Sequence, residues 1–137
     1  MLFKKIGTLL SLCLFAMGLS AQTNIDFTKY TLDNGLKVIL HQDATAPIVA
    51  VSIMYEVGGK DSFEGRTGFA HFFEHLLFEG SKNIKRGEYA KYVEDAGGVL
   101  NANTSQDRTY YYEILPSNKL ELGLWLESER LLHAVVD

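Results

Sequence analysis

Alternating apolar and polar residues predict strands in the first half of the chain. Residues 27–32 and 36–40 alternate on either side of Asp33-Asn34-Gly35. An Asn-Gly pair between such segments favours a hairpin, because both residues tolerate the positive φ of a tight turn. A β-branched run from Ile48 to Tyr55 predicts a third, central strand, and Gly58-Gly59 ends it.

The middle of the chain has the apolar spacing of helices. The first predicted helix covers residues 67–79, with Thr67 as the expected N-cap and Gly80 as the residue after the helix. A second helix is expected over 88–96, ended by Gly97-Gly98.

The last third of the chain predicts a strand pair and a long helix. Residues 99–105 and 108–115 are the expected strands, and 118–135 the expected amphipathic helix. The apolar stripe of that helix is Leu120, Leu124, Leu131 and Val135.

The predicted order is therefore β-β-β-α-α-β-β-α, which indicates an α+β fold with a mostly antiparallel sheet and helices packed on one face. Residues 22–137 form one folding unit in this interpretation. Because the chain stops at Asp137 directly after a helix, with no closing strand, we expect an incomplete domain.

The first 21 residues are typical of a signal peptide. A short basic start precedes an apolar run from Ile6 to Leu19, and small residues precede the expected cleavage after Ala21. The run is shorter than the roughly 20 residues that span a bilayer, so we expect no stable membrane anchor after cleavage. The expected location is outside the cytoplasm, either periplasmic or secreted.

Charge and cysteine content narrow the chemistry. The 137 residues include 13 Lys and Arg and 17 Asp and Glu, which gives a formal charge of −4. The sequence has no basic stripe of the kind that would indicate a nucleic-acid partner. The only cysteine, Cys13, lies in the predicted signal peptide. The mature chain would therefore have neither cysteine-ligated zinc nor a cysteine nucleophile.

The helix over 67–79 carries the residues that suggest chemistry. At about 100° per residue, His71, Glu74 and His75 fall within roughly 100° of arc. Gly68 lies beside the histidines, where it would leave room for a ligand. The opposite side is apolar, and we expect it in the core: Phe69, Phe72, Phe73, Leu76 and Leu77.

Two imidazoles four residues apart can direct ring nitrogens at one zinc ion, about 2.0–2.1 Å from each. A carboxylate next to the second histidine can take a proton from zinc-activated water. The order H-x-x-E-H is the inverse of the common H-E-x-x-H pattern. The alternative is a pair of helix-surface histidines that bond to Glu74 or Glu79.

Taken together, these segments closely resemble the pitrilysin/insulinase family of zinc metallopeptidases. The resemblance extends over nearly all of residues 27–137. It rests on residues 30–38, the inverted motif within 65–81, the segment Gly97-Gly98-Val99-Leu100-Asn101-Ala102-Asn103-Thr104-Ser105, and Thr109-Tyr110-Tyr111-Tyr112.

The resemblance implies a zinc endopeptidase, with His71 and His75 as zinc ligands and Glu74 as general base. It also implies that an extended peptide or unfolded protein pairs, as an added strand, with the segment containing Asn101 and Ala102. Spacing alone favours solvent-facing roles for Asn101 and Asn103. The family also implies a second homologous domain or subunit that closes the catalytic chamber.

In one respect the chain departs from the family. In that family the third zinc ligand is a glutamate on a later helix. Counting the family's interval from the zinc motif leads to a position beyond Asp137. The earlier glutamates are expected on solvated faces: Glu113, Glu121, Glu127 and Glu129. We therefore expect little proteolysis from these residues alone. A non-catalytic partner subunit and a peptide-binding module with an incidental histidine pair are the alternatives.

Overall fold

The computed structural model describes residues 25–136 and divides the chain into two units, with the division between Ala44 and Thr45. The predicted signal peptide, residues 1–21, lies outside the described residues. Among residues 25–136, no helix is both long and apolar enough to cross a membrane.

The first unit contains an antiparallel hairpin of β1 (Thr28–Thr31) and β2 (Lys37–Leu40). The turn differs from the expected one, because no described residue other than glycine has a positive φ, so Asn34 does not. Gly35 has a φ of 89° and donates its N–H to the Leu32 carbonyl at 2.8 Å. Asn34 acts through its side chain, whose Oδ1 accepts from the Leu36 N–H at 3.1 Å.

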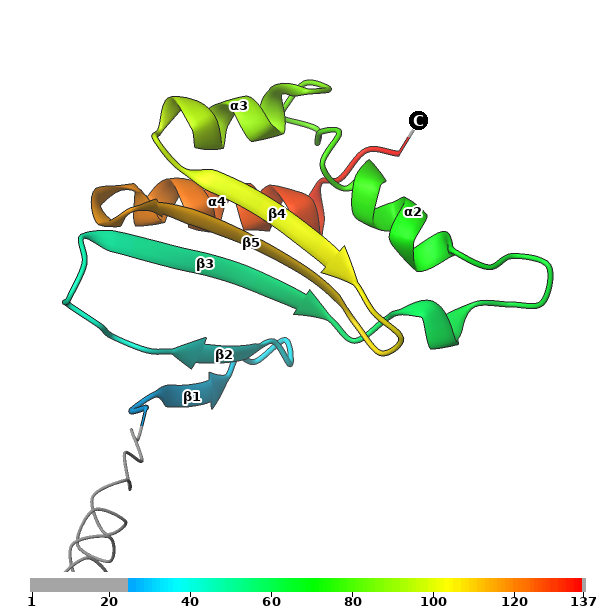
Figure 1. Cartoon of the computed structure of the whole chain (residues 1–137), viewed down its shortest axis with the longest axis horizontal. Coiled ribbons are helices and arrows are strands. Elements are labelled where there is room, and N and C mark those ends of the chain that lie inside the picture. The colour runs from blue at the N-terminus through cyan, green and yellow to red at the C-terminus, as the bar shows by residue number, and fades with distance from the viewer. Residues whose placement is uncertain (1–24, 137) are drawn as a thin grey trace, which may run out of the picture. The chain divides into compact units, whose positions relative to one another are not determined.

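The second unit is built on a three-stranded antiparallel sheet in the order β3-β5-β4 (Figure 1). The strands are β3 (Ile48–Tyr55), β4 (Val99–Thr104) and β5 (Thr109–Pro116). β5 is central, with Tyr111 opposite Ile53 of β3 and Ala102 of β4. This order leaves β4 at one edge of the sheet.

The helices of this unit are α2 (Phe69–Leu76), α3 (Glu88–Asp95) and α4 (Leu120–Leu132), with 3-10 turns η1 (Gly59–Asp61) and η2 (Ser117–Lys119). They cover one face of the sheet. Along β5, Thr109, Tyr111, Glu113 and Leu115 are buried against them, whereas the residues between point to the other face. The predicted element order and fold class, α+β with helices on one face, are confirmed.

The apolar core lies between α3, α4 and the sheet. Its buried side chains are Ile84, Tyr89, Val93, Leu115 and Leu126.

α4 packs through a different face from the one predicted. Leu120, Leu124 and Leu131 are exposed, and Val135 lies beyond the end of the helix. The buried residues of α4 are Gly123, Leu126, Glu127, Glu129 and Arg130. The expected stripe was wrong because a second stripe, which includes a buried ion pair, has its partners on the sheet.

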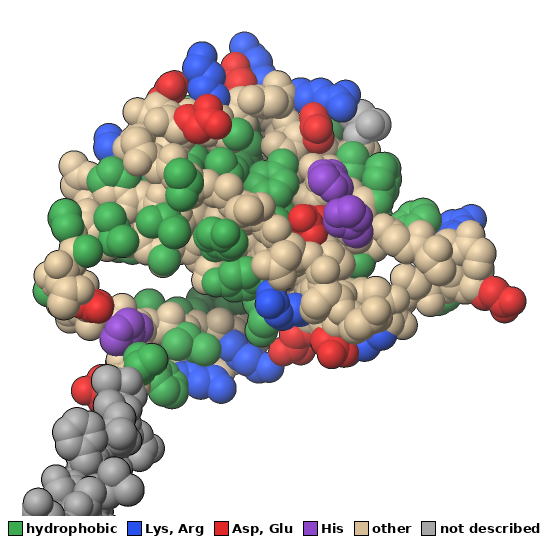
Figure 2. Space-filling model, in the orientation of Figure 1, with side chains coloured by type: hydrophobic (Ala, Val, Ile, Leu, Met, Phe, Trp, Pro, Cys, Tyr) green, Lys and Arg blue, Asp and Glu red, His purple; other side chains and the backbone are tan. Residues whose placement is uncertain are grey.

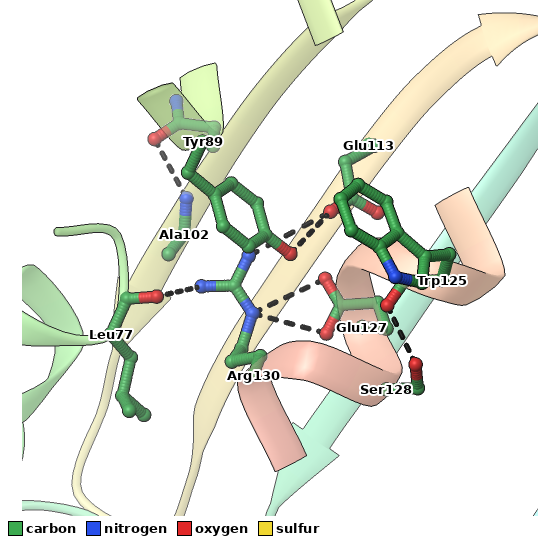
Figure 3. Close-up of polar contacts among 9 residues, drawn as sticks. Leu77, Tyr89, Ala102, Glu113, Trp125, Glu127, Ser128 and Arg130 are labelled. Carbon is green, nitrogen blue, oxygen red and sulfur yellow. Dashed lines mark hydrogen bonds and ion pairs between the residues drawn. The ribbon is translucent and has the colours of Figure 1, made fainter. Parts of the chain in front are cut away.

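Three of the four glutamates expected on solvated faces are buried instead, and only Glu121 is exposed. Glu127 accepts from Arg130 Nε at 3.1 and 3.3 Å. Glu113 Oε1 accepts from the Tyr89 hydroxyl at 3.2 Å and lies 3.7 Å from Arg130 Nη2 (Figure 3). These polar partners replace water, which allows the carboxyl groups to be buried.

Arg130 is at the centre of this cluster. Its guanidinium carbon lies 4.8, 4.4 and 4.1 Å from the ring centroids of Phe78, Tyr89 and Tyr111. Its Nη1 donates to the Leu77 carbonyl at 2.8 Å, immediately after α2 (Figure 3). Arg130 therefore connects α4 to the end of the helix that carries the histidine pair.

The third buried carboxylate, Glu129, has its own partners. It accepts from Ser81 Oγ at 2.6 Å and from Asn83 Nδ2 at 2.8 Å. The Ser81 hydroxyl is the main cause that lowers the pKa of Glu129, and the Asn83 amide adds to it. Glu129 is therefore held ionised by the loop that follows α2.

Candidate metal and peptide site

α2 begins one residue later and ends earlier than the sequence predicts. Gly68 is the N-cap residue with a φ of 85°, and Thr67 makes no cap. This φ explains the glycine, because a side chain at this position would be strained. The helix ends at Leu76 because the following turns tighten, with the Phe78 N–H bound to the His75 carbonyl at 3.1 Å. Gly80 is therefore not the residue that ends it.

His71 and His75 are adjacent on the exposed side of α2. Their Nε2 atoms are 3.2 Å apart and their ring centroids 4.8 Å apart. Figure 2 shows two neighbouring histidine side chains at the surface, beside an acidic side chain. Two nitrogens bound to one tetrahedral zinc at about 2.0–2.1 Å are separated by about 3.3 Å. The observed separation therefore fits two ligands of one ion.

Glu74 is buried, with 8% of its surface exposed, whereas His71 and His75 of the same motif are exposed. Its Oε2 accepts a hydrogen bond from the hydroxyl of Thr104, the last residue of β4. The alternative of a histidine–glutamate pair is not seen, since Glu79 instead binds Arg86 Nε at 2.6 Å. The sheet thus fixes one carboxylate oxygen of Glu74, and the histidine pair remains accessible.

A second threonine, Thr109, lies beside this contact without a hydrogen bond to Thr104. Thr109 Oγ donates to the Val57 carbonyl at 2.9 Å and lies 3.4 Å from Thr104 Oγ. Since a carbonyl can only accept, the single hydroxyl proton of Thr109 is used there. The single hydroxyl proton of Thr104 is likewise given to Glu74.

The aromatic side of α2 is not in the core, contrary to the prediction. Phe69, Phe72 and Phe73 are 46%, 56% and 43% exposed. Their rings contact each other at 6.3–6.4 Å between centroids. A cavity of about 350 Å³ lies below this side of the helix. Its apolar walls include Tyr55, Val57, Phe69, Phe73, Leu77 and Tyr111.

The predicted peptide-binding residues lie on β4, at the free edge of the sheet. Asn101 and Asn103 are exposed on the face away from the helices, and Ala102 is half-buried on the helix side. Thr104 is on the same strand and binds Glu74. The structure therefore joins the predicted peptide edge to the predicted general base through one strand.

Within residues 25–136, no group of three or more His, Cys, Asp or Glu side chains could hold a metal ion. The two imidazoles fit zinc in donor type and separation, and Glu74 turns one oxygen towards Thr104. The described residues can thus supply two nitrogen ligands. Completing the usual set of three protein ligands needs a further group.

Sequence reasoning did not single out Thr104 or Thr109 as site residues. Thr104 lies 30 positions from Glu74, and no local periodicity connects them. The signal that could have found it is its place at the end of a strand that packs against α2.

Comparisons with known proteins identify the family of the chain. Residues 37–129 match the family described as Insulinase (Peptidase family M16), and the chain belongs to this family. It is 35% identical over 132 residues to "Zinc protease PqqE" of Helicobacter pylori, an alignment that covers 93% of this chain and 30% of that protein.

Solved structures similar to the chain include the following two. A crystal structure of a protease from Helicobacter pylori has a TM-score of 0.79 and 34% identity, covering 83% of this chain and 27% of that one. Pitrilysin has a TM-score of 0.77 and 28% identity, covering 86% and 13%. The chain thus spans less than a third of the length of these relatives.

Proposed function

We propose that this chain carries the zinc-binding helix and the peptide-binding edge of an exported zinc endopeptidase. The observation that supports this most directly is the arrangement on α2. The two Nε2 atoms lie 3.2 Å apart on its exposed side, and the adjacent carboxylate of Glu74 is held by Thr104. Membership of a peptidase family, with relatives named zinc proteases, supports the same chemistry.

In this proposal, the Nε2 atoms of His71 and His75 would hold a zinc ion. Zinc supplies Lewis acidity, which lowers the pKa of a bound water to about 7. Glu74 acts as the general base through Oε1, because Oε2 is engaged by the Thr104 hydroxyl. A carboxylate fixed at one oxygen loses little freedom when the other accepts a proton.

The proposed substrate is an extended peptide or an unfolded segment that pairs with the edge of β4. Main-chain hydrogen bonds hold such a strand irrespective of most of its side chains. Asn101 and Ala102 are at the middle of the edge, and Thr104 at its end is next to the general base. A second homologous domain or subunit would close the site and exclude water.

The proposed export rests on the first 21 residues of the sequence, with cleavage after Ala21.

The test is zinc binding by the chain, measured by calorimetric titration of metal-free protein. We expect one zinc per chain, with weak affinity because two of the usual three protein ligands are present. His71→Ala and His75→Ala should each abolish measurable binding, whereas Glu74→Gln should retain it. His133→Ala is the matched control, since this exposed histidine lies just after α4. Equal zinc binding by wild type and His71→Ala would refute the proposed site.

A further inference from the structure

Along the edge of β4 that faces away from β5, every second residue turns its backbone N–H and C=O outward. The turn between β4 and β5 sets their phase, because the Ser105 N–H donates to the Arg108 carbonyl at 2.8 Å. In an antiparallel pair, hydrogen-bonded and non-hydrogen-bonded positions alternate. Ala102 opposite Tyr111 is therefore a non-hydrogen-bonded pair. The N–H and C=O of Ala102 point away from β5, towards the edge where a further strand would add.

The Ala102 N–H already has a partner. Asn101 Oδ1 accepts it at 2.8 Å, and Figure 3 draws this bond at Ala102. The acceptor comes from the preceding side chain rather than from another strand. An unpaired N–H on an exposed edge is a template for pairing with another chain, and covering it reduces that hazard.

Asn103 provides an internal comparison. It is the same residue type, is also exposed, and lies on the same face of β4 as Asn101. It takes the hydrogen-bonded position opposite Tyr110, so its own backbone faces β5. Within the described chain, its side chain makes no bond to an edge N–H. The two asparagines therefore differ in this one interaction.

We propose that the carboxamide of Asn101 is an intramolecular cap on the peptide-binding edge. It occupies the Ala102 N–H while no peptide is present, and it swings away when a peptide carbonyl takes that position. The proposal rests on the proposed function, because the occupant is the extended peptide assigned there to this edge. The cap keeps the edge from pairing with other strands, and a fully paired peptide overcomes it through several main-chain bonds.

This cap has a definite consequence for affinity. A peptide that binds the wild-type chain exchanges one hydrogen bond of the Ala102 N–H for another. In Asn101→Ala the donor is free, so the peptide gains that bond without displacing the carboxamide. Peptide affinity should therefore rise roughly two- to twelvefold, the equivalent of one net hydrogen bond. Asn103→Ala should leave affinity near the wild-type value.

Two measurements on the full chain test this. The first is amide hydrogen exchange at Ala102 without peptide, compared among wild type, Asn101→Ala and Asn103→Ala. The second is fluorescence anisotropy with a fluorescein-labelled peptide of alternating threonine and valine, flanked by lysines. Faster Ala102 exchange in Asn101→Ala alone, together with tighter peptide binding by that variant, is the expected result.

Unchanged Ala102 exchange in Asn101→Ala would overturn the cap. Weaker peptide binding by Asn101→Ala would also overturn it, because Asn101 would then be a peptide contact rather than a competitor. If neither wild type nor any variant bound the peptide, while wild type bound zinc normally, the edge would lose its proposed occupant. The cap would then have no role. Failure of the zinc titration, in contrast, would refute the proposed function and leave Ala102 exchange unaffected.

Discussion

The buried carboxyl group of Glu113 makes the stability of this protein depend on pH. Glu113 and Glu127 share a single guanidinium, that of Arg130, and all three side chains are buried. Arg130 binds Glu127 closely, at 3.1 Å, and Glu113 only at 3.7 Å. Glu113 Oε2 is buried without a hydrogen-bond partner among the described residues. An ionised Glu113 would therefore be a poorly compensated buried charge.

Burial and the neighbouring Glu127 carboxyl group raise the pKa of Glu113 from 4.5 to about 9. Between these two values, the folded chain binds one proton more than the unfolded chain at this position. Its contribution to stability is complete below pH 4.5 and is lost as pH rises towards 9. The free energy of unfolding should fall by up to about 1.4 kcal/mol per pH unit within this window.

Glu113→Gln removes the ionisation and retains an oxygen that can accept from the Tyr89 hydroxyl. We expect urea unfolding from about pH 6 to about pH 8 to give a flatter pH dependence for this variant than for wild type. Over that range the difference between the two should change by up to about 3 kcal/mol in favour of glutamine.

Glu121→Gln is the control, since Glu121 is exposed in the first turn of α4. Its pH dependence should parallel that of wild type. Parallel curves for wild type and Glu113→Gln would show that Glu113 is ionised in the folded state at neutral pH, and the reasoning above would be wrong.

Two further predictions concern α4 and the site. Leu126→Ala should lower the free energy of unfolding by about 2–5 kcal/mol, because Leu126 is fully buried. Leu124→Ala, at a position 55% exposed on the same helix, should change it by less than about 0.5 kcal/mol, and equal effects in denaturant titrations would contradict the packing described here. Thr104→Val should cost about 1–3 kcal/mol because the buried Glu74 carboxylate loses its donor. Thr104→Ser should restore most of this in the same assay, and a serine variant as unstable as valine would argue against the hydrogen bond.

Local patterns in the sequence were sufficient for the strands and for the histidine pair. The motif His71, Glu74 and His75 lies within two turns of one helix, so the helical period alone brings the histidines to one side. The turn at Gly35 and the element order also follow from nearby residues. The detail that failed there, the φ of Asn34, depends on which type of turn the hairpin selects.

The face of α4 could not be chosen from its own sequence. Leu120, Leu124 and Leu131 form one helical stripe, and Gly123, Leu126, Glu127 and Arg130 form another. The second stripe contains charges, and charge patterns usually indicate solvated faces. Glu127 and Arg130 pair with each other on α4. Their further polar partners, Glu113 and Tyr89, come from β5 and α3, so only the assembled fold shows that this stripe is buried.

The same limit explains the aromatic side of α2. Apolar residues opposite a polar motif usually face the core, and here Phe69, Phe72 and Phe73 remain exposed among the described residues. What holds α2 is instead a set of polar contacts made by residues far along the chain. Arg130 binds the Leu77 carbonyl, and Thr104 binds Glu74.

These contacts connect the buried side chain of Arg130 to the helix that carries the candidate metal ligands. A metal-binding pair needs both imidazoles held at one separation, and exposed side chains on a short helix do not provide that by themselves. α2 has eight residues, too few to be stable alone. Thr104 fixes its middle and Arg130 its end, and Arg130 is itself placed by Glu127 and three aromatic rings. The buried pair of Arg130 and Glu127 thus supports the helix that carries the histidine pair.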